Sequence, residues 1–194
     1  MKKIDKYVPF YEPRYTQDDP KYEYTEVEAV RTYVDNEDDV VIIGGGFGVT
    51  AVVASKQTSG EVTVFEQTPS TYEILKRTIK INGRGDNIKL RLNAVGKVSN
   101  STFTDEHPSN VEVISPKELP PSDVYEIDCE GAETIILREM TERPLTILVE
   151  THNNHEEVIE ILNQNGYNVV ESIKDGEGQH PKCTHVRAKI ETNN

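Results

Sequence analysis

Hydrophobic and polar residues alternate along the chain in short blocks, and the spacing switches repeatedly between that of a strand and that of a helix. Short apolar runs such as Val40–Ile43 predict buried strands, whereas apolar residues three or four positions apart, as at Val27, Val30 and Val34, predict a helix. The predicted strands cover residues 40–43, 61–66, 88–92, 124–128, 145–151, 167–172 and 184–190, with a shorter run at 111–114, and the predicted helices cover 25–34, 47–56, 70–81, 133–140 and 154–163.

The order of these elements predicts the fold class. Buried strands that alternate with helices form parallel sheets with both faces covered, because each connecting helix packs back on the sheet. The last two strands are joined by the polar loop 174–179, which predicts an antiparallel hairpin at one edge. We therefore expect an α/β fold with a doubly wound, mostly parallel sheet.

The first 24 residues differ from the rest of the chain. They hold five of the nine tyrosines and three of the ten prolines, and prolines at this density prevent a long helix. We expect residues 1–24 to form an irregular aromatic arm, which either packs over the domain edge or acts as a flap over a pocket. Residues 25–194 are expected to form the domain itself.

Charge and cysteine content limit the partners and the compartment. The chain has 34 acidic and 21 basic residues, and its formal charge of -13 repels phosphate backbones, so we expect no nucleic-acid partner. No apolar run reaches the roughly 18 residues of a membrane span, and no secretory signal begins the chain. Cys129 and Cys183 cannot build a disulfide framework, and we expect a cytoplasmic protein with both thiols reduced. The pattern does not indicate an oligomeric state.

The stretch 40–50 runs from an apolar strand through a cluster of glycines into a predicted helix. Glycine allows the backbone to turn sharply and approach a ligand, and a helix N-terminus offers free N–H groups. Glu66 ends the next predicted strand, where a carboxylate can accept both hydroxyls of a ribose. Because ligands of doubly wound sheets bind at the carboxyl ends of the strands, we expect Gly44 and Glu66 to meet there. The alternative is a glycine-rich turn without a ligand.

The glycine spacing distinguishes between cofactors. A dinucleotide fingerprint requires a third glycine at position 49, which is Val49 here. The glycines instead stand at Gly44, Gly46 and Gly48. This spacing is similar to motif I of class I S-adenosylmethionine (SAM) methyltransferases, whose loop surrounds the methionine half of the cofactor. Those enzymes usually carry an acid two residues before the first glycine, where this chain has Ile42.

A second informative stretch follows the predicted strand 124–128. Asp128, Glu130 and Glu133 surround Gly131, and crowded carboxylates need a cation, a donor or a shared proton. They therefore predict a working site at the mouth of the same crevice. The alternative is that they only cap the next helix.

Together these motifs resemble the FkbM-type branch of SAM-dependent methyltransferases over residues 26 to 190. The family signature D-x-E-G-x-E is matched by Asp128, Glu130, Gly131 and Glu133. The resemblance implies the class I methyltransferase fold, a Rossmann-like, seven-stranded, mostly parallel sheet with an antiparallel edge hairpin.

The resemblance also implies an activity, the O-methylation of a hydroxyl on a small molecule or a glycan, with SAM as the methyl donor. His152 follows Glu150 by two residues, as in the family, and an imidazole whose pKa is about 6.5 suits a general base. The implied cofactor-binding residues are Gly44, Gly46, Gly48, Glu66, Asn93 and Asp128, and the implied catalytic residues are Asp128, Glu130, Glu150 and His152. The catalytic set could also hold magnesium or manganese, although we do not favour a divalent metal.

Two further readings stay open. The start of the glycine loop also looks like that of flavoprotein chains, so a flavin- or nicotinamide-binding oxidoreductase is one alternative. Ile42 and Glu126 depart from the family pattern, which makes a catalytically inactive binding module the other. We expect the aromatic arm and the polar loop 100–110 to determine selectivity for the acceptor. The loop is either a lid over the site or an ordinary surface loop.

Overall fold

The computed structural model describes residues 8–9, 22–99, 110–174 and 183–190, and the structural statements below concern these residues. Its helices are α1 (Tyr24–Tyr33), α2 (Val49–Gln57), α3 (Pro69–Ile81), α4 (Glu133–Glu139) and α5 (His155–Gln164), with a short 3₁₀ helix at Pro116–Glu118. Its strands are β1 (Val40–Ile43), β2 (Val62–Glu66), β3 (Ile88–Val95), β4 (Glu112–Ile114), β5 (Val124–Ile127), β6 (Thr146–His152), β7 (Tyr167–Lys174) and β8 (Cys183–Ile190).

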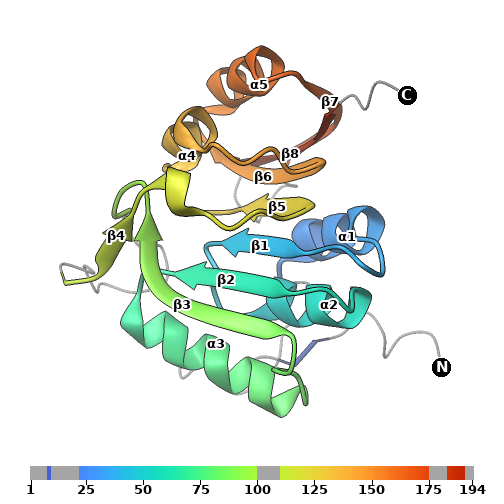
Figure 1. Cartoon of the computed structure of the whole chain (residues 1–194), viewed down its shortest axis with the longest axis vertical. Coiled ribbons are helices and arrows are strands. Elements are labelled where there is room, and N and C mark those ends of the chain that lie inside the picture. The colour runs from blue at the N-terminus through green and yellow to red at the C-terminus, as the bar shows by residue number, and fades with distance from the viewer. Residues whose placement is uncertain (1–7, 10–21, 100–109, 175–182, 191–194) are drawn as a thin grey trace.

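The strands form one sheet in the order β4-β3-β2-β1-β5-β6-β8-β7, and Figure 1 shows the central strands stacked in this order. All pairings from β4 to β6 are parallel, whereas β8 runs antiparallel to β6 and to β7. The predicted doubly wound α/β fold with an antiparallel edge hairpin is confirmed. The sheet has eight strands instead of seven, because Asn93–Val95 extend β3 and pair with the three-residue strand β4.

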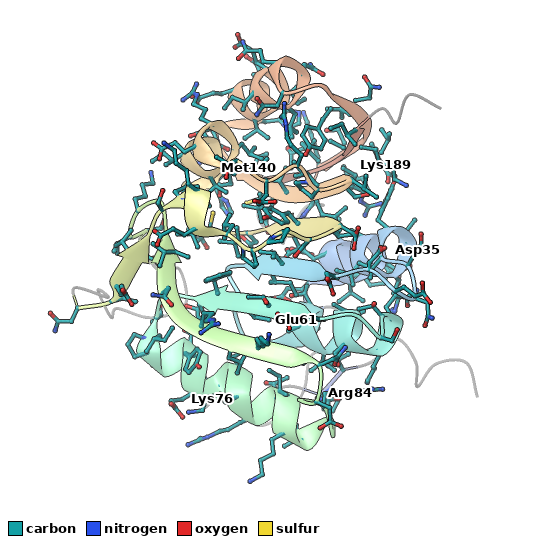
Figure 2. All side chains as sticks on the ribbon, in the orientation of Figure 1. Asp35, Glu61, Lys76, Arg84, Met140 and Lys189 are labelled. Atoms are coloured by element: carbon teal, nitrogen blue, oxygen red, sulfur yellow. The ribbon has the colours of Figure 1, made fainter. Side chains whose placement is uncertain are left out.

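Two hydrophobic cores lie on opposite faces of the sheet, as the alternation of side chains along a strand requires. In β1, Ile42 packs with residues of α1, α2 and α3, whereas Ile43 packs with residues of α4 and α5. Side chains fill the space on both sides of the ribbon in Figure 2, and charged groups such as Lys76 on α3 lie at the rim. The sheet is therefore held from both faces, and its strand ends are fixed relative to one another.

Two predicted helix starts were wrong. The first helix begins at Tyr24 instead of Thr25, and Glu23 takes the cap position with a left-handed backbone. The second helix begins at Val49 instead of Phe47, since Gly46 and Gly48 have φ angles of 48° and 88°, outside the helical region.

Much of the predicted arm lies outside the described residues, as does most of the loop 100–110 and of the loop 174–179. Where the arm is described, the carbonyl of Pro9 accepts a hydrogen bond of 2.7 Å from Nδ2 of Asn82 at the end of α3. The flap and the lid therefore stay predictions. Within the described ranges, no helix is long and apolar enough to cross a membrane.

Candidate active site

A cleft opens at the carboxyl ends of the parallel strands, where the doubly wound fold places its ligands. It holds about 620 Å³ of space between the atoms, open space at its mouth included. The described residues that line it are Glu23, Ile43, Gly44, Gly46, Glu66, Gln67, Thr68, Thr71, Asn93, Ala94, Val95, Lys97, Ser99, Asp128, Cys129 and Glu130. Among them, four carboxylates face one lysine.

The glycine loop after β1 forms one wall of the cleft. Gly44 has a φ of 96°, and a Cβ built there would lie 1.6 Å from the carbonyl oxygen of Asp128. Only glycine fits this position, because the loop passes directly against the end of β5. The loop and the acidic segment after β5 therefore meet in one site, as the sequence predicted.

Glu66 ends β2 beneath this loop. Its Oε2 accepts a hydrogen bond of 3.0 Å from the N–H of Gly46, and its Oε1 accepts one of 2.7 Å from the N–H of Thr68. Burial raises the pKa of Glu66 to about 7, although these N–H groups oppose the shift. The carboxylate thus lies at the expected strand end and also fixes the glycine loop.

The other predicted cofactor residues separate into two groups. Asn93 lines the cleft, and its Nδ2 donates to Oε2 of Glu112 at 3.1 Å. Gly48 does not line the cleft: it is buried, and a Cβ there would lie 2.8 Å from a methyl group of Leu75 in α3. The structure therefore places Gly48 at the contact between the loop and α3.

A histidine and a glutamate lie beside the cleft, next to Asp128 and Glu130, although neither is among the residues that line it. Nδ1 of His152, at the end of β6, lies 2.8 Å from Oε1 of Glu133 in the first turn of α4. Glu133 is fully buried and also accepts hydrogen bonds from the N–H of Gly131 and from Nδ2 of Asn154. These bonds hold the carboxylate, and it in turn orients the imidazole.

The free edge of this imidazole faces three further carboxylates. Nε2 of His152 lies 3.7 Å from Asp128, 3.5 Å from Glu130 and 3.7 Å from Glu150. The structure thus brings all four predicted catalytic residues together. Burial disfavours a charged ring, but the bond to Glu133 and the neighbouring Asp128 and Glu130 raise the pKa of His152 to about 9. At neutral pH the ring is therefore an imidazolium between carboxylates.

The carboxylates respond to burial in different ways. Burial and the nearby Glu150 raise the pKa of Asp128, and the charge of His152 only partly opposes this. Burial also disfavours ionisation of Glu133, but hydrogen bonds from His152, Gly131 and Asn154 lower its pKa overall. Glu133 is thus the carboxyl group that keeps its negative charge at neutral pH.

Three residues other than glycine have positive φ angles in the described part of the chain: Glu23 at 50°, Glu130 at 54° and Asn153 at 63°. Glu23 and Glu130 line the cleft, and Asn153 follows His152 directly. A left-handed backbone costs about 1–2 kcal/mol at such residues, and strained residues cluster at functional sites. The strain therefore marks the same region as the chemistry.

Two groups of described residues have ligand atoms close enough to share a metal ion. In each group the possible ligand atoms lie within 4.8 Å of one another. One group is Glu150, His152 and Cys183, and the other is Glu26, Glu150 and His185. The predicted set of Asp128, Glu130, Glu150 and His152 differs from both. In that set the imidazolium supplies one positive charge among three carboxyl groups.

Sequence reasoning missed two functional candidates. Glu133 was noted as part of the signature but not assigned a role, and Glu23 was placed in the arm. The family motif could have indicated Glu133 by its pairing with His152. Nothing in the local pattern around Glu23 indicates that its side chain enters the cleft.

The sheet order and the position of the cleft define the class of fold, that of the Rossmann-like class I methyltransferases. Three solved structures show the same arrangement. A precorrin-6y C5,15-methyltransferase from Geobacter metallireducens superimposes with a TM-score of 0.62 at 15% identity, covering 94% of this chain and 93% of its own. A ribosomal protein L11 methylase from Lactobacillus delbrueckii superimposes with a TM-score of 0.64 at 12% identity, covering 95% of this chain and 86% of its own. An rRNA methylase from Streptococcus thermophilus superimposes with a TM-score of 0.58 at 12% identity, covering 87% of this chain and 96% of its own.

These likenesses concern the fold, since all three identities are low. No family model matches the chain, and no curated protein matches it in sequence. Membership of the FkbM-type branch therefore stays a prediction. The three solved relatives are described as acting on a precorrin, a ribosomal protein and rRNA, so one fold serves acceptors of very different chemistry.

Proposed function

We propose that this protein is a SAM-dependent methyltransferase that transfers a methyl group to a hydroxyl of a small molecule or a glycan. The observation that carries the proposal is the charge of the cleft. Glu23, Glu66, Asp128 and Glu130 line it and oppose one cation, Lys97. Burial raises the pKa of Glu23 to about 8 and that of Glu66 to about 7 in the free protein, and a sulfonium cofactor would favour the ionised form of both groups. The diphosphate of a flavin or nicotinamide dinucleotide would instead be repelled by every carboxylate that ionises.

The glycine loop supports the same choice. In a dinucleotide-binding fold, backbone N–H groups at the start of the helix hold the phosphates. Here the N–H of Gly46 donates to Glu66, so this donor is directed to a carboxylate and not to a phosphate. Antiparallel β8 beside β6 also differs from the all-parallel dinucleotide-binding sheet. Both facts disfavour the oxidoreductase alternative.

The residues present fit SAM. Gly44 lets the loop pass against the end of β5, and Gly46 puts no side chain into the cleft, so these two residues would hold the methionine half. Glu66 would accept the ribose hydroxyls with its remaining lone pairs, and Asn93 would lie towards the adenine. When bound, SAM supplies a methyl group on a positively charged sulfur.

On the acceptor side, His152 would take the proton from the attacking hydroxyl through Nε2, while Glu133 holds Nδ1. Asp128, Glu130 and Glu150 surround this nitrogen and would position the acceptor. Because the free protein raises the pKa of His152 to about 9, the base form becomes more populated as pH rises. We therefore expect turnover to increase from pH 7 to pH 9.

The acceptor class rests on electrostatics. The formal charge of -13 and the acidic cleft disfavour RNA, although one relative of similar fold is an rRNA methylase. A neutral hydroxyl compound meets no such repulsion. Within this proposal, the D-x-E-G-x-E match supports membership of the FkbM-type branch.

The test is transfer of a labelled methyl group from SAM to a panel of glycans and small hydroxyl compounds. His152→Gln keeps a donor towards Glu133 but removes the base, so kcat should fall by about 10²–10⁴ while affinity for S-adenosylhomocysteine changes less than about threefold. His155→Ala is the matched control, because this histidine starts α5 outside the residues that line the cleft. Unchanged turnover in the Gln variant would show that the base is wrongly assigned, and transfer to no acceptor would favour the inactive module.

A further inference from the structure

Glu23 is a half-buried acid to which the proposed mechanism assigns no individual role. It directly precedes α1, with a left-handed backbone of φ 50° and ψ 39° and no side-chain capping bond. Hydrogen bonds from the Tyr22 side chain and the Thr50 backbone lower the pKa of its carboxyl group, but its Oε2 is buried and has no hydrogen-bond partner among the described residues. An orphaned carboxylate oxygen is expensive to bury, so a ligand that brings donors to it is the simplest physical reason for its position.

The position of Glu23 relative to the glycine loop narrows the kind of ligand. A Cβ built on Gly46 would lie 3.2 Å from Oε1 of Glu23, so the carboxylate stands directly over the loop. Glu66 holds the N–H of Gly46 at 3.0 Å, which places two carboxylates around one glycine. The charges of Glu26 and Glu66 act on Glu23, and both raise its pKa because they are negative. The ligand that fits this place is therefore a cation with N–H donors.

The strand before the loop cannot provide such a group. Ile42 lies two residues before Gly44, is fully buried and packs in the core beneath α1 and α2. The negative charge on this side of the loop thus comes from the segment before α1. Burial raises the pKa of Glu23 to about 8, the expected behaviour of a carboxyl group that lacks its cationic partner.

We infer that Glu23 forms a subsite for a primary ammonium group, the α-ammonium of the methionine half of SAM and of S-adenosylhomocysteine. This inference rests on the proposed function. The ammonium carries three N–H donors and a positive charge, and it would provide Oε2 with the hydrogen bond that it lacks. Glu23 would then select amino-acid-bearing adenosyl ligands over plain nucleosides.

The experiment is calorimetric titration of the full chain with two ligands that share the adenosyl thioether. S-adenosylhomocysteine carries the ammonium, and 5′-methylthioadenosine lacks it. Glu23→Gln should weaken the affinity for S-adenosylhomocysteine by about ten- to a hundredfold, as expected for a lost charge-assisted hydrogen bond. The affinity for 5′-methylthioadenosine should change by less than about twofold. Glu23→Asp keeps the charge on a shorter arm and should fall between wild type and the Gln variant.

Glu26→Gln is the matched control. It removes the same charge one helical turn away, from a residue outside the cleft lining, and should leave both affinities within about twofold of wild type. Retained affinity for 5′-methylthioadenosine shows that the variant cleft is folded. An equal loss for both ligands in Glu23→Gln, or no loss for either, would overturn the ammonium subsite while the proposed function survives. If wild type binds neither ligand, both proposals fail together.

Discussion

The cleft and the cluster of residues beside it hold their acids in different ways. On the side that we propose for the cofactor, called the cofactor side below, Glu66 is held by backbone N–H groups of Gly46 and Thr68. On the side that we propose for the acceptor, called the acceptor side, Glu133 is held chiefly by the side chains of His152 and Asn154, which come from another strand and the loop after it. The first arrangement depends on the backbone course of a loop, and the second depends on the identity of distant side chains.

This difference has a functional consequence. Backbone donors tolerate most neighbouring side chains, so the cofactor side needs only a few glycines and one acid. Side-chain networks lose their geometry when one member changes, so each substitution on the acceptor side has a specific effect. We therefore expect substitutions in the loop to affect binding and substitutions near His152 to affect the chemical step.

The largest effect is expected at the point where the two sides touch. Gly44→Ala would force a methyl group into the carbonyl of Asp128 at a φ of 96°, so binding of S-adenosylhomocysteine should be lost and the melting temperature should fall. Gly83→Ala is the matched control, because its φ of 63° carries the same kind of strain with nothing within 4 Å. The control should lose only about 1–2 kcal/mol of unfolding free energy. Equal losses in both variants would contradict the close approach.

The pH dependence of stability tests the buried groups of both sides together. The folded protein raises the pKa of Glu66 from 4.5 to about 7 and that of His152 from 6.5 to about 9. Both groups bind protons more tightly when folded, so their contribution is present at low pH and is lost as pH rises through 7 and then 9. Because one pKa unit corresponds to about 1.4 kcal/mol, the two shifts together should lower the free energy of unfolding by several kcal/mol between pH 5 and pH 9.

Urea denaturation at pH 5.5, 7 and 9 measures this loss. His152→Gln should reduce the slope between pH 7 and pH 9, where Glu23 with its pKa of about 8 still contributes, and should leave the part below pH 6 intact. A wild-type protein that becomes more stable as pH rises to 9 would refute the assignment of the raised pKa values.

A smaller and more local effect is expected from Glu133→Gln. Because the bond from Glu133 is the main factor that raises the pKa of His152, its loss should move the rising limb of the pH–rate profile down by about one pH unit. Glu139→Gln, at the exposed end of the same helix, is the control and should leave the limb in place. An unmoved limb in Glu133→Gln would show that His152 does not control the rate.

The sequence predicted the cofactor side better than the acceptor side. Apolar periodicity indicated the central strands, and the glycines with Glu66 indicated the loop, because both signals are local. It indicated β4 as a short run but not the extension of β3 that pairs with it, and it assigned Gly48 to the cofactor although this glycine packs on Leu75. The pair of Glu133 and His152 depends on how α4 sits against β6, and the burial of Glu23 depends on how α1 meets the loop. Such tertiary contacts leave no trace in local spacing.

The most direct test of the cofactor assignment is calorimetric titration of the purified protein with S-adenosylhomocysteine, beside NADH. We predict micromolar binding of S-adenosylhomocysteine that is lost in Glu66→Ala and kept in Glu61→Ala, an exposed acid just before the same strand. NADH should not bind, because the cleft repels its diphosphate. Binding of NADH, or binding of neither ligand, would contradict the assignment of this cleft to an adenosyl sulfonium cofactor.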